Sequence, residues 1–352
     1  MDFEGTGVTQ SVASGTDAPQ AGATRPRTLD AFGRHINYLR VSLTDKCNLR
    51  CVYCMPEHMV FRPGDELLSG DEFIRVLQAA SMLGFDKYRL TGGEPTVHPG
   101  LVDIVAALRA LPGTREIAMT TNGLRLARLA QPLKAAGMDR VNISIDTLDA
   151  ERYHRITRWG KVEDVLAGIA AAEAAGLTPI KLNAVVLRGY NEDDVAPLAA
   201  LTLARPWHFR FIEVMPFGDV ADFQQASIVT TAEMMARIQA ALGALAPVND
   251  GKLDGEARMY RLPNAQGQVG FISPVSAPFC ASCNRVRLTA DGTLRLCLLK
   301  DGEIDLKTPL RRGARAEDLA ELIRAGIWRK PWGHDLKDGV IPLNRVMSEI
   351  GG

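Results

Sequence analysis

Short runs of β-branched or apolar residues alternate with amphipathic helical stretches from about residue 36 to residue 214. The apolar runs predict six strands, at residues 38–43, 87–90, 116–120, 140–145, 179–186 and 208–214. The stretches between them predict helices at residues 71–83, 101–110, 124–136, 162–175 and 195–204, with Ser69 or Asp71 as the cap of the first. Strands that alternate with helices predict a parallel sheet with helices outside it.

Right-handed crossovers repeated in this way curl a sheet into a full or partial barrel. An open doubly wound sheet has the same alternation, and periodicity alone does not separate the two arrangements. We expect an α/β protein with a partial (βα)6 barrel of TIM type over residues 31–216.

The two flanks of this region have a different composition. Residues 1–30 are rich in Gly, Ala, Thr, Ser, Pro and Gln, which predicts a disordered N-terminal tail because too little apolar surface is available to offset ordering. After residue 216 the alternation stops. A helix at 231–242, strands at 267–273, 285–288 and 293–296, and helical sequence at 316–326 predict a C-terminal region, 217–352, that covers one end of the barrel. Residues 217–265 contain no motif that indicates chemistry.

The balance of charge limits the classes of partner. The 352 residues include 41 basic and 41 acidic side chains, which argues against broad nucleic-acid or anionic-membrane binding. No uninterrupted apolar run reaches the ~18 residues of a membrane span, and the first residues do not resemble a secretory signal. We therefore expect a cytoplasmic protein, in which six cysteines indicate metal binding or catalysis rather than disulfides.

Three cysteines follow the first predicted strand in a Cys-x3-Cys-x2-Cys spacing: Cys47, Cys51 and Cys54. Active sites of barrels lie at this end of the strands. Three thiolates can hold three corners of a cubane iron–sulfur cluster and leave the fourth iron open to another ligand. A structural zinc site would need a fourth protein ligand, for which His58 is the nearest candidate.

A second group of three follows a Cys-x2-Cys-x13-Cys spacing: Cys280, Cys283 and Cys297. Half of a zinc ribbon is the alternative here, and it too lacks a fourth ligand unless the distant His334 supplies it. Arg285 and Arg287 share one face of the predicted strand beside this group. Two adjacent guanidinium groups suit a multiply charged anion such as a triphosphate.

The first spacing, with Tyr53 before the third cysteine, resembles the signature of the radical S-adenosylmethionine (SAM) superfamily. The resemblance implies a [4Fe–4S] cluster whose open iron binds SAM, which is cleaved to a radical that abstracts hydrogen from the substrate. The segment Gly92-Gly93-Glu94-Pro95 is similar to the GGEP stretch of that superfamily. The resemblance implies SAM contacts at Tyr53, Gly93, Ser144 and Met215.

The second spacing, together with the terminal Gly351-Gly352, resembles the GTP 3′,8-cyclase family of molybdenum cofactor biosynthesis, from about residue 30 onward. The resemblance implies a second [4Fe–4S] cluster in the C-terminal extension and a tail that reaches the active site. It also implies GTP contacts at Arg40, Arg89, Thr120, Lys181, Arg285, Val286 and Arg287. Arg210 aligns with a family arginine near SAM, and no catalytic side chain is implied beyond the cluster ligands. The sequence Thr96-Val97-His98 departs from the family, which often has basic residues there.

The implied reaction is that of a lyase, which converts GTP to 3′,8-cyclo-7,8-dihydro-GTP. The implied partners are an electron donor and a downstream cyclic pyranopterin monophosphate synthase, and a homodimer is consistent with the resemblance. Two other hypotheses remain open. One is a different radical SAM enzyme with an auxiliary cluster, such as a peptide-modifying enzyme, and the other is a non-catalytic metal-binding protein.

Overall fold

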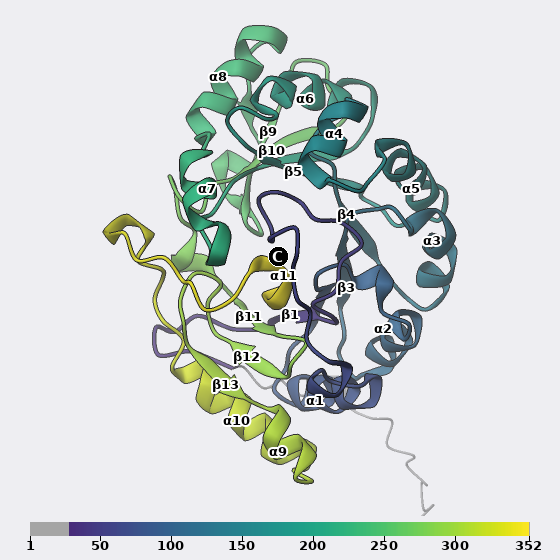
Figure 1. Cartoon of the computed structure of the whole chain (residues 1–352), viewed down its shortest axis with the longest axis vertical. Helices are drawn as coiled ribbons and strands as arrows, with labels where there is room; N and C mark the ends of the chain where they lie inside the picture. Colours follow the sequence, from purple (N-terminus) through teal and green to yellow (C-terminus); the bar gives the residue numbers. More distant parts are fainter. Residues whose placement is uncertain (1–27, 352) are drawn as a thin grey trace, which may run out of the picture.

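The strands of the computed structural model, which describes residues 28–351, form one curved sheet with helices around its outer side (Figure 1). Its first six strands pair in chain order, and each pair of neighbours is parallel. These strands are β1 (Tyr38–Ser42), β2 (Lys87–Thr91), β3 (Glu116–Thr121), β4 (Arg140–Ser144), β5 (Lys181–Val186) and β6 (His208–Glu213). The expected α/β fold with a partial barrel is confirmed, and the open doubly wound alternative is wrong because the helices lie outside the curved sheet rather than on both faces.

Strands of the C-terminal region extend the sheet at both edges. β11 (Arg285–Leu288) pairs in parallel with β1, and β10 (Gln268–Ile272) pairs in parallel with β6. Antiparallel strands follow on each side: β12 (Thr293–Arg295) and β13 (Glu303–Asp305) beyond β11, and β9 (Ala257–Arg261), β7 (Ala246–Pro247) and β8 (Leu253–Asp254) beyond β10. The C-terminal region therefore does more than cover one end of the barrel, because it also supplies hydrogen-bonding partners to the backbone of both edge strands.

The outer helices follow the predicted pattern closely. They are α1 (Gly70–Met82), α2 (Leu101–Ala110), α3 (Leu126–Ala135), α4 (Ala150–Thr157), α5 (Val162–Ala174) and α6 (Val195–Ala204). Ser69 caps α1: its hydroxyl accepts from the Glu72 amide at 3.2 Å, and the Glu72 carboxylate accepts from the Ser69 amide at 2.8 Å. The sequence pattern did not predict α4, because few of its eight residues are apolar.

The remaining helices belong to the C-terminal region. They are α7 (Ala221–Ala226), α8 (Thr231–Leu242), α9 (Lys307–Arg311), α10 (Ala316–Trp328) and α11 (Met347–Ile350). Single 3₁₀ turns lie at Gly64–Glu66, Pro95–Val97, Glu192–Asp194, Gly218–Val220, Asn249–Gly251, Cys280–Ser282 and Leu336–Asp338. Helix α10 packs against α1 on the outer layer. In the described part of the chain none of the helices combines the length and the apolar character that crossing a bilayer requires.

The predicted tail, residues 1–30, lies mostly outside the described residues. Its last three residues belong to the folded part: the Thr28 hydroxyl donates to the Leu83 carbonyl at 2.8 Å, and the buried Asp30 carboxylate pairs with Arg34 at 2.6 Å. Residues 28–30 are thus part of the folded region.

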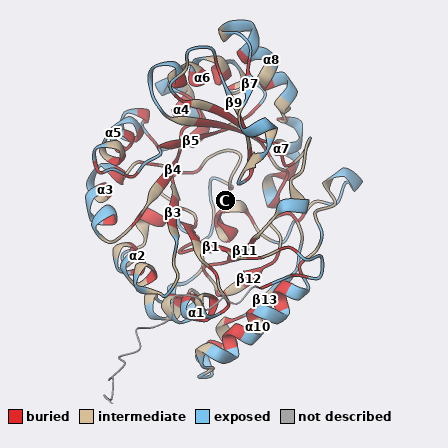
Figure 2. Ribbon diagram, turned by 180° about the vertical axis from the view of Figure 1, so that it is seen from behind, coloured by how far each residue is buried: buried red, intermediate tan, exposed pale blue. Residues whose placement is uncertain are grey.

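Side-chain alternation along the strands separates an apolar layer from a polar interior. Leu39 and Val41 of β1 belong to the core between sheet and helices, which is the buried layer in Figure 2. The strand register places Arg40 beside Arg89 of β2 on one side and beside Arg287 of β11 on the other. A row of three arginines therefore crosses three neighbouring strands inside the barrel.

Candidate functional site

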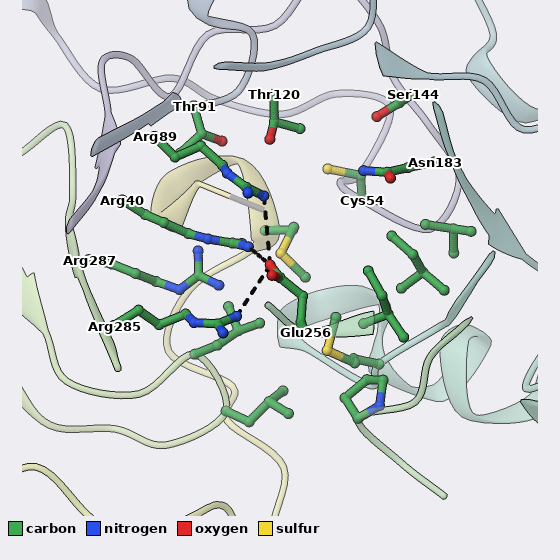
Figure 3. Close-up of a pocket in the computed structure, with 18 of the residues that line it drawn as sticks. Arg40, Cys54, Arg89, Thr91, Thr120, Ser144, Asn183, Glu256, Arg285 and Arg287 are labelled. Atoms are coloured by element: carbon green, nitrogen blue, oxygen red, sulfur yellow. Dashed lines mark hydrogen bonds and ion pairs between the residues drawn. The ribbon is translucent and has the colours of Figure 1, made fainter. Parts of the chain in front are cut away.

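Both groups of cysteines line one cavity of about 300 Å³ in the interior of the barrel (Figure 3). The cavity wall also includes most of the residues predicted to contact SAM or GTP: Arg40, Tyr53, Arg89, Gly93, Thr120, Ser144, Arg210, Met215, Arg285, Val286 and Arg287. Lys181 is the exception, because its ammonium group lies 3.1 Å from the Asp254 carboxylate rather than in the wall. Residues 96–98 also lie outside the wall, where Thr96 donates to the Glu94 carboxylate at 2.5 Å.

The first cysteine loop connects β1 to the helices and is fixed by Arg50. The Arg50 guanidinium donates to the carbonyl oxygens of Cys47 and Leu49, both at 2.8 Å, and lies over the Trp159 ring at 4.2 Å from its centroid. Burial raises the pKa of Cys47 and of Cys54 to about 12. These thiols therefore stay protonated at neutral pH until a metal displaces their protons.

Carboxylates surround this loop. Glu94, which ends the Gly-Gly-Glu-Pro stretch, is buried and accepts from the Thr121 hydroxyl at 2.7 Å and the Asn122 amide at 2.8 Å. A Cβ at Gly93 would overlap the carbonyl oxygen of Lys46, so this glycine lets the two loops pack backbone to backbone. In the sequence, Glu94 is only one member of the motif. In the structure, its hydrogen bonds connect the loop after β2 to the loop after β3.

Asp146 is a second buried carboxylate at this end, and the sequence argument did not single it out. It accepts from the Tyr53 hydroxyl and from the Val185 amide, both at 2.9 Å. Burial raises the pKa of Asp146 to about 6. The hydrogen bond holds the Tyr53 side chain in the cavity wall beside the first cysteine group.

Cations gather at the other end of the cavity. Figure 3 shows the guanidinium groups of Arg40, Arg89 and Arg285 converging on the carboxylate of Glu256. The nitrogen–oxygen distances are 3.2 Å for Arg285 and 3.6 Å for Arg89, and Arg40 forms the third ion pair. Although burial alone would raise it, the three arginines hold the pKa of Glu256 well below its usual range. Glu256 was missed at the sequence level, since a single acid in a glycine-rich turn carries no motif.

The buried positive charges at this end outnumber the carboxylates that pair with them. Burial lowers the pKa of Arg210 to about 10, and burial with repulsion from Arg210 lowers the pKa of Lys181 to about 8. The Nε atoms of Arg40, Arg89 and Arg285 have no hydrogen-bond partner among residues 28–351. Buried donors without partners and an excess of positive charge fit an anionic ligand.

The second cysteine group lies beside this cationic end: Cys280 and Cys283 share one loop, and Cys297 follows β12. The Arg34 guanidinium donates to the Cys280 carbonyl at 2.8 Å and so fixes the loop from the first described turn of the chain. Lys330 is buried, and its ammonium group donates to the carbonyl of Leu296, next to Cys297. Although burial alone would raise it, Lys330 and Arg285 lower the pKa of the Cys283 thiol.

The donor set of each cysteine group fits an iron–sulfur cluster with one open corner. Each group presents three thiols that form no disulfide, and thiolates are the ligands that such clusters use. A Cβ at Gly333 would lie 3.0 Å from the Cys280 sulfur, so only glycine leaves this thiol free space on that side. Within residues 28–351 no three His, Cys, Asp or Glu side chains are grouped closely enough to hold a single metal ion.

The last described residue of the chain lies against the same cavity. Arg287 donates to the carbonyl oxygen of Gly351, and a Cβ on Gly351 would lie 2.5 Å from the Thr91 methyl group. The φ of Gly351 is 72°, in the left-handed region that favours glycine. Gly352, the second residue of the predicted motif, lies outside the described residues.

Two family profiles match consecutive parts of the chain. Residues 41–202 match the radical SAM superfamily, and residues 207–336 match the family described as Molybdenum Cofactor Synthesis C. By structure, the chain is similar to Streptococcus suis SuiB bound to precursor peptide SuiA, with a TM-score of 0.55 at 13% identity, over 88% of this chain and 72% of that one. This likeness concerns the fold alone.

Curated relatives match nearly the whole chain. The GTP 3′,8-cyclase of Pelotomaculum thermopropionicum is 50% identical over 324 residues, which is 92% of this chain and 99% of the relative. Those of Heliobacterium modesticaldum and Pseudomonas putida are 48% and 45% identical, over 92% of this chain and 100% and 98% of the relatives. With these identities, the two matched profiles and both groups of three cysteines in one barrel cavity, the chain belongs to the GTP 3′,8-cyclase family of the radical SAM superfamily.

Proposed function

We propose that this chain converts GTP to 3′,8-cyclo-7,8-dihydro-GTP as a radical SAM lyase, the first committed step toward the molybdenum cofactor. One observation carries the proposal: two groups of three thiols face a single cavity, and arginines suited to a triphosphate lie in the same wall. A cavity of this kind brings two bound molecules within reach of each other.

The carboxylate-lined end would hold the first cluster and SAM. Cys47, Cys51 and Cys54 would bind the cluster, and Tyr53, Gly93, Ser144 and Met215 would contact SAM. When bound, this pair supplies an adenosyl radical that removes a hydrogen atom from the substrate. Asp146 and Glu94 hold the loops at this end in place through their hydrogen bonds, so the cavity is shaped before either ligand arrives.

The cation-lined end would hold GTP. Arg40, Arg89, Arg285 and Arg287 would bind the phosphates, with Thr120, Lys181 and Val286 as further contacts. Guanidinium groups suit this task because their paired N–H donors match phosphate oxygens. Cys280, Cys283 and Cys297 would hold a second [4Fe–4S] cluster with one corner left for a substrate atom.

Exclusion of water is the other contribution of the chain. Ile350 is buried against Phe217 and Leu299, and Gly351 is held by Arg287, so the C-terminal segment closes one side of the cavity. A reactive carbon radical needs such shielding.

We further propose an electron donor for the first cluster, a cyclic pyranopterin monophosphate synthase that takes the product, and a homodimeric assembly.

The proposal predicts transfer of one particular hydrogen. The chain is reconstituted anaerobically with iron and sulfide, then incubated with SAM, a reductant and GTP carrying deuterium at C3′. We expect 5′-deoxyadenosine that contains deuterium, together with a cyclised GTP product, by mass spectrometry. Formation of 5′-deoxyadenosine that is independent of GTP and free of deuterium would show that GTP is not the hydrogen donor.

A further inference from the structure

Glu256 lies at the tip of a short hairpin that enters the cavity. Strands β8 and β9 are joined by a two-residue turn, Gly255-Glu256, since Asp254 pairs with Ala257 in the ladder. Gly255 has a φ of 68° and is exposed, whereas Glu256 beside it is 6% exposed. The turn therefore points one carboxylate into the barrel and keeps the glycine at the surface.

The hairpin presents its carboxylates to cations from four other strands. Glu256 contacts Arg40 of β1, Arg89 of β2 and Arg285 of β11, as the dashed lines in Figure 3 show. Two positions earlier, Asp254 contacts Lys181 of β5 at 3.1 Å. All four cations are among the residues proposed above to contact GTP, so the hairpin holds the groups that the nucleotide would need.

One carboxylate is a poor permanent partner for three guanidinium groups. Five arginines line the cavity, and among residues 28–351 Glu256 is the only carboxylate that forms an ion pair with any of them. It has two oxygens, and the Nε donors of Arg40, Arg89 and Arg285 stay without partners. A triphosphate offers more charge and more acceptor oxygens to the same donors. Without any counterion, the buried arginines would repel one another and lose hydration.

We propose that Glu256 is a positioning residue that acts as an internal counterion: it gathers Arg40, Arg89 and Arg285 while the site is empty, and releases them to the substrate phosphates on binding. The tip of the hairpin then turns away from the arginines, and Asp254 gives up Lys181 at the same time. This inference rests on the proposed GTP contacts of these arginines.

If the phosphates replace Glu256 as the partner of the arginines, removing the charge of Glu256 changes ligand affinity and ligand-free stability in opposite directions. Glu256→Gln keeps the size of the side chain and removes its charge, so the phosphates no longer compete with an anion. We expect GTP and inorganic triphosphate to bind about tenfold more tightly, which is the effect of one charge-assisted contact. The ligand-free variant unfolds at a lower temperature than wild type, because its arginines have lost their counterion, and GTP restores the difference.

The test uses full-length, anaerobically reconstituted protein. Isothermal titration gives the dissociation constants of GTP and of inorganic triphosphate, and thermal unfolding is measured with and without GTP. Glu303→Gln is the matched control, since Glu303 pairs with the buried Arg295 and with Arg345 outside the cavity. The control loses stability without gaining affinity. In turnover assays Glu256→Gln lowers KM for GTP and does not raise kcat, a separation that a merely structural carboxylate would not produce.

Amide hydrogen exchange of the wild-type protein tests the motion without any variant. We expect residues 252–261 to exchange faster when GTP is bound, because the hairpin has lost both carboxylate contacts. Unchanged or weaker binding of both anions by Glu256→Gln overturns the counterion role, as does slower or equal exchange of the hairpin with GTP. Failure of the wild-type protein to bind GTP would instead refute the proposed substrate, so the two failures are distinguishable.

Discussion

The two ends of the cavity hold the same number of thiols in opposite electrostatic surroundings. Around the first cysteine loop the buried carboxylates Glu94 and Asp146 add to the effect of burial in raising the pKa of Cys47 and Cys51, and Arg50 opposes this at Cys47. Around the second cysteine group Lys330 and Arg285 lower the pKa of Cys283, whereas burial raises the pKa of Cys297. Identical donor sets are thus placed in different fields by residues far from the cysteines in sequence.

This difference suits the two ligands proposed for the two ends. SAM carries a sulfonium cation, which carboxylates attract and cations repel. GTP carries a polyanion, for which the preference is reversed. We therefore expect charge to favour SAM at the carboxylate-lined end and GTP at the cation-lined end.

The largest effect is expected from removing one thiol at each end. Cys51→Ser abolishes formation of 5′-deoxyadenosine, because the first cluster loses a ligand. Cys283→Ser leaves SAM cleavage measurable and abolishes the cyclised product. Chromatography of both products from the same reaction separates the cases. Loss of SAM cleavage in both variants, with iron at the first site intact, would remove the division of labour between the two loops.

A smaller effect is expected from the cation-lined end. Arg285→Ala raises the dissociation constant of GTP by about 10- to 100-fold, the loss expected for charge-assisted contacts, and leaves the affinity for SAM unchanged. Arg285→Lys keeps the charge but not the paired donors, so its dissociation constant for GTP lies between those of the wild type and of Arg285→Ala. Titration of each ligand separately checks the result, and an equal loss of SAM affinity would mean that the two ends are not separate.

At the carboxylate-lined end, Glu94→Gln replaces one acceptor oxygen by a donor that faces Thr121 or Asn122. We expect the free energy of unfolding to fall by about 1–3 kcal/mol, since a buried donor is left facing another donor. Denaturant unfolding of the ligand-free protein measures this change. The affinity for GTP serves as the control and stays at the wild-type value; a parallel loss would contradict the separation of the ends.

The smallest effect concerns pH. Burial and the neighbouring Arg210 hold the pKa of Lys181 at about 8, so this side chain is a cation below pH 8 and loses its proton as the pH rises through that value. The affinity for GTP therefore falls by up to about tenfold between pH 7 and pH 9, the effect of one charged contact. Lys181→Arg stays charged over this range, and its affinity is expected to be flat. A wild-type profile as flat as that of Lys181→Arg would show that Lys181 does not contact the phosphates.

The strands and helices of the barrel were predictable because their patterns are local. The β-branched runs predicted the first six strands of the curved sheet, and Ser69, one of the two predicted caps, does cap α1. Both cysteine groups were predicted from their spacing, because Cys47, Cys51 and Cys54 share one loop and Cys280 and Cys283 share another. The placement of most predicted contact residues in one cavity wall agrees with that interpretation.

The features that were missed depend on pairings between distant segments. Strand β11 pairs with β1, and the hairpin of β8 and β9 reaches the arginines because β9 pairs with β10 and β10 pairs with β6. Glu256 lies in a stretch without any motif, and Asp146 and Lys330 are ordinary charged residues in the linear sequence. These three side chains meet their partners only because distant strands pair, and neither a local hydrophobic pattern nor a motif spacing predicts that pairing.

The most direct test of the account is a count of iron in three proteins reconstituted side by side: the wild type, a variant with Cys47, Cys51 and Cys54 changed to Ser, and a variant with Cys280, Cys283 and Cys297 changed to Ser. Two independent three-thiol sites predict about eight iron atoms per wild-type chain and about four in each variant. Zinc in place of iron, or loss of all iron from either variant, would contradict the claim that two separate clusters face one cavity.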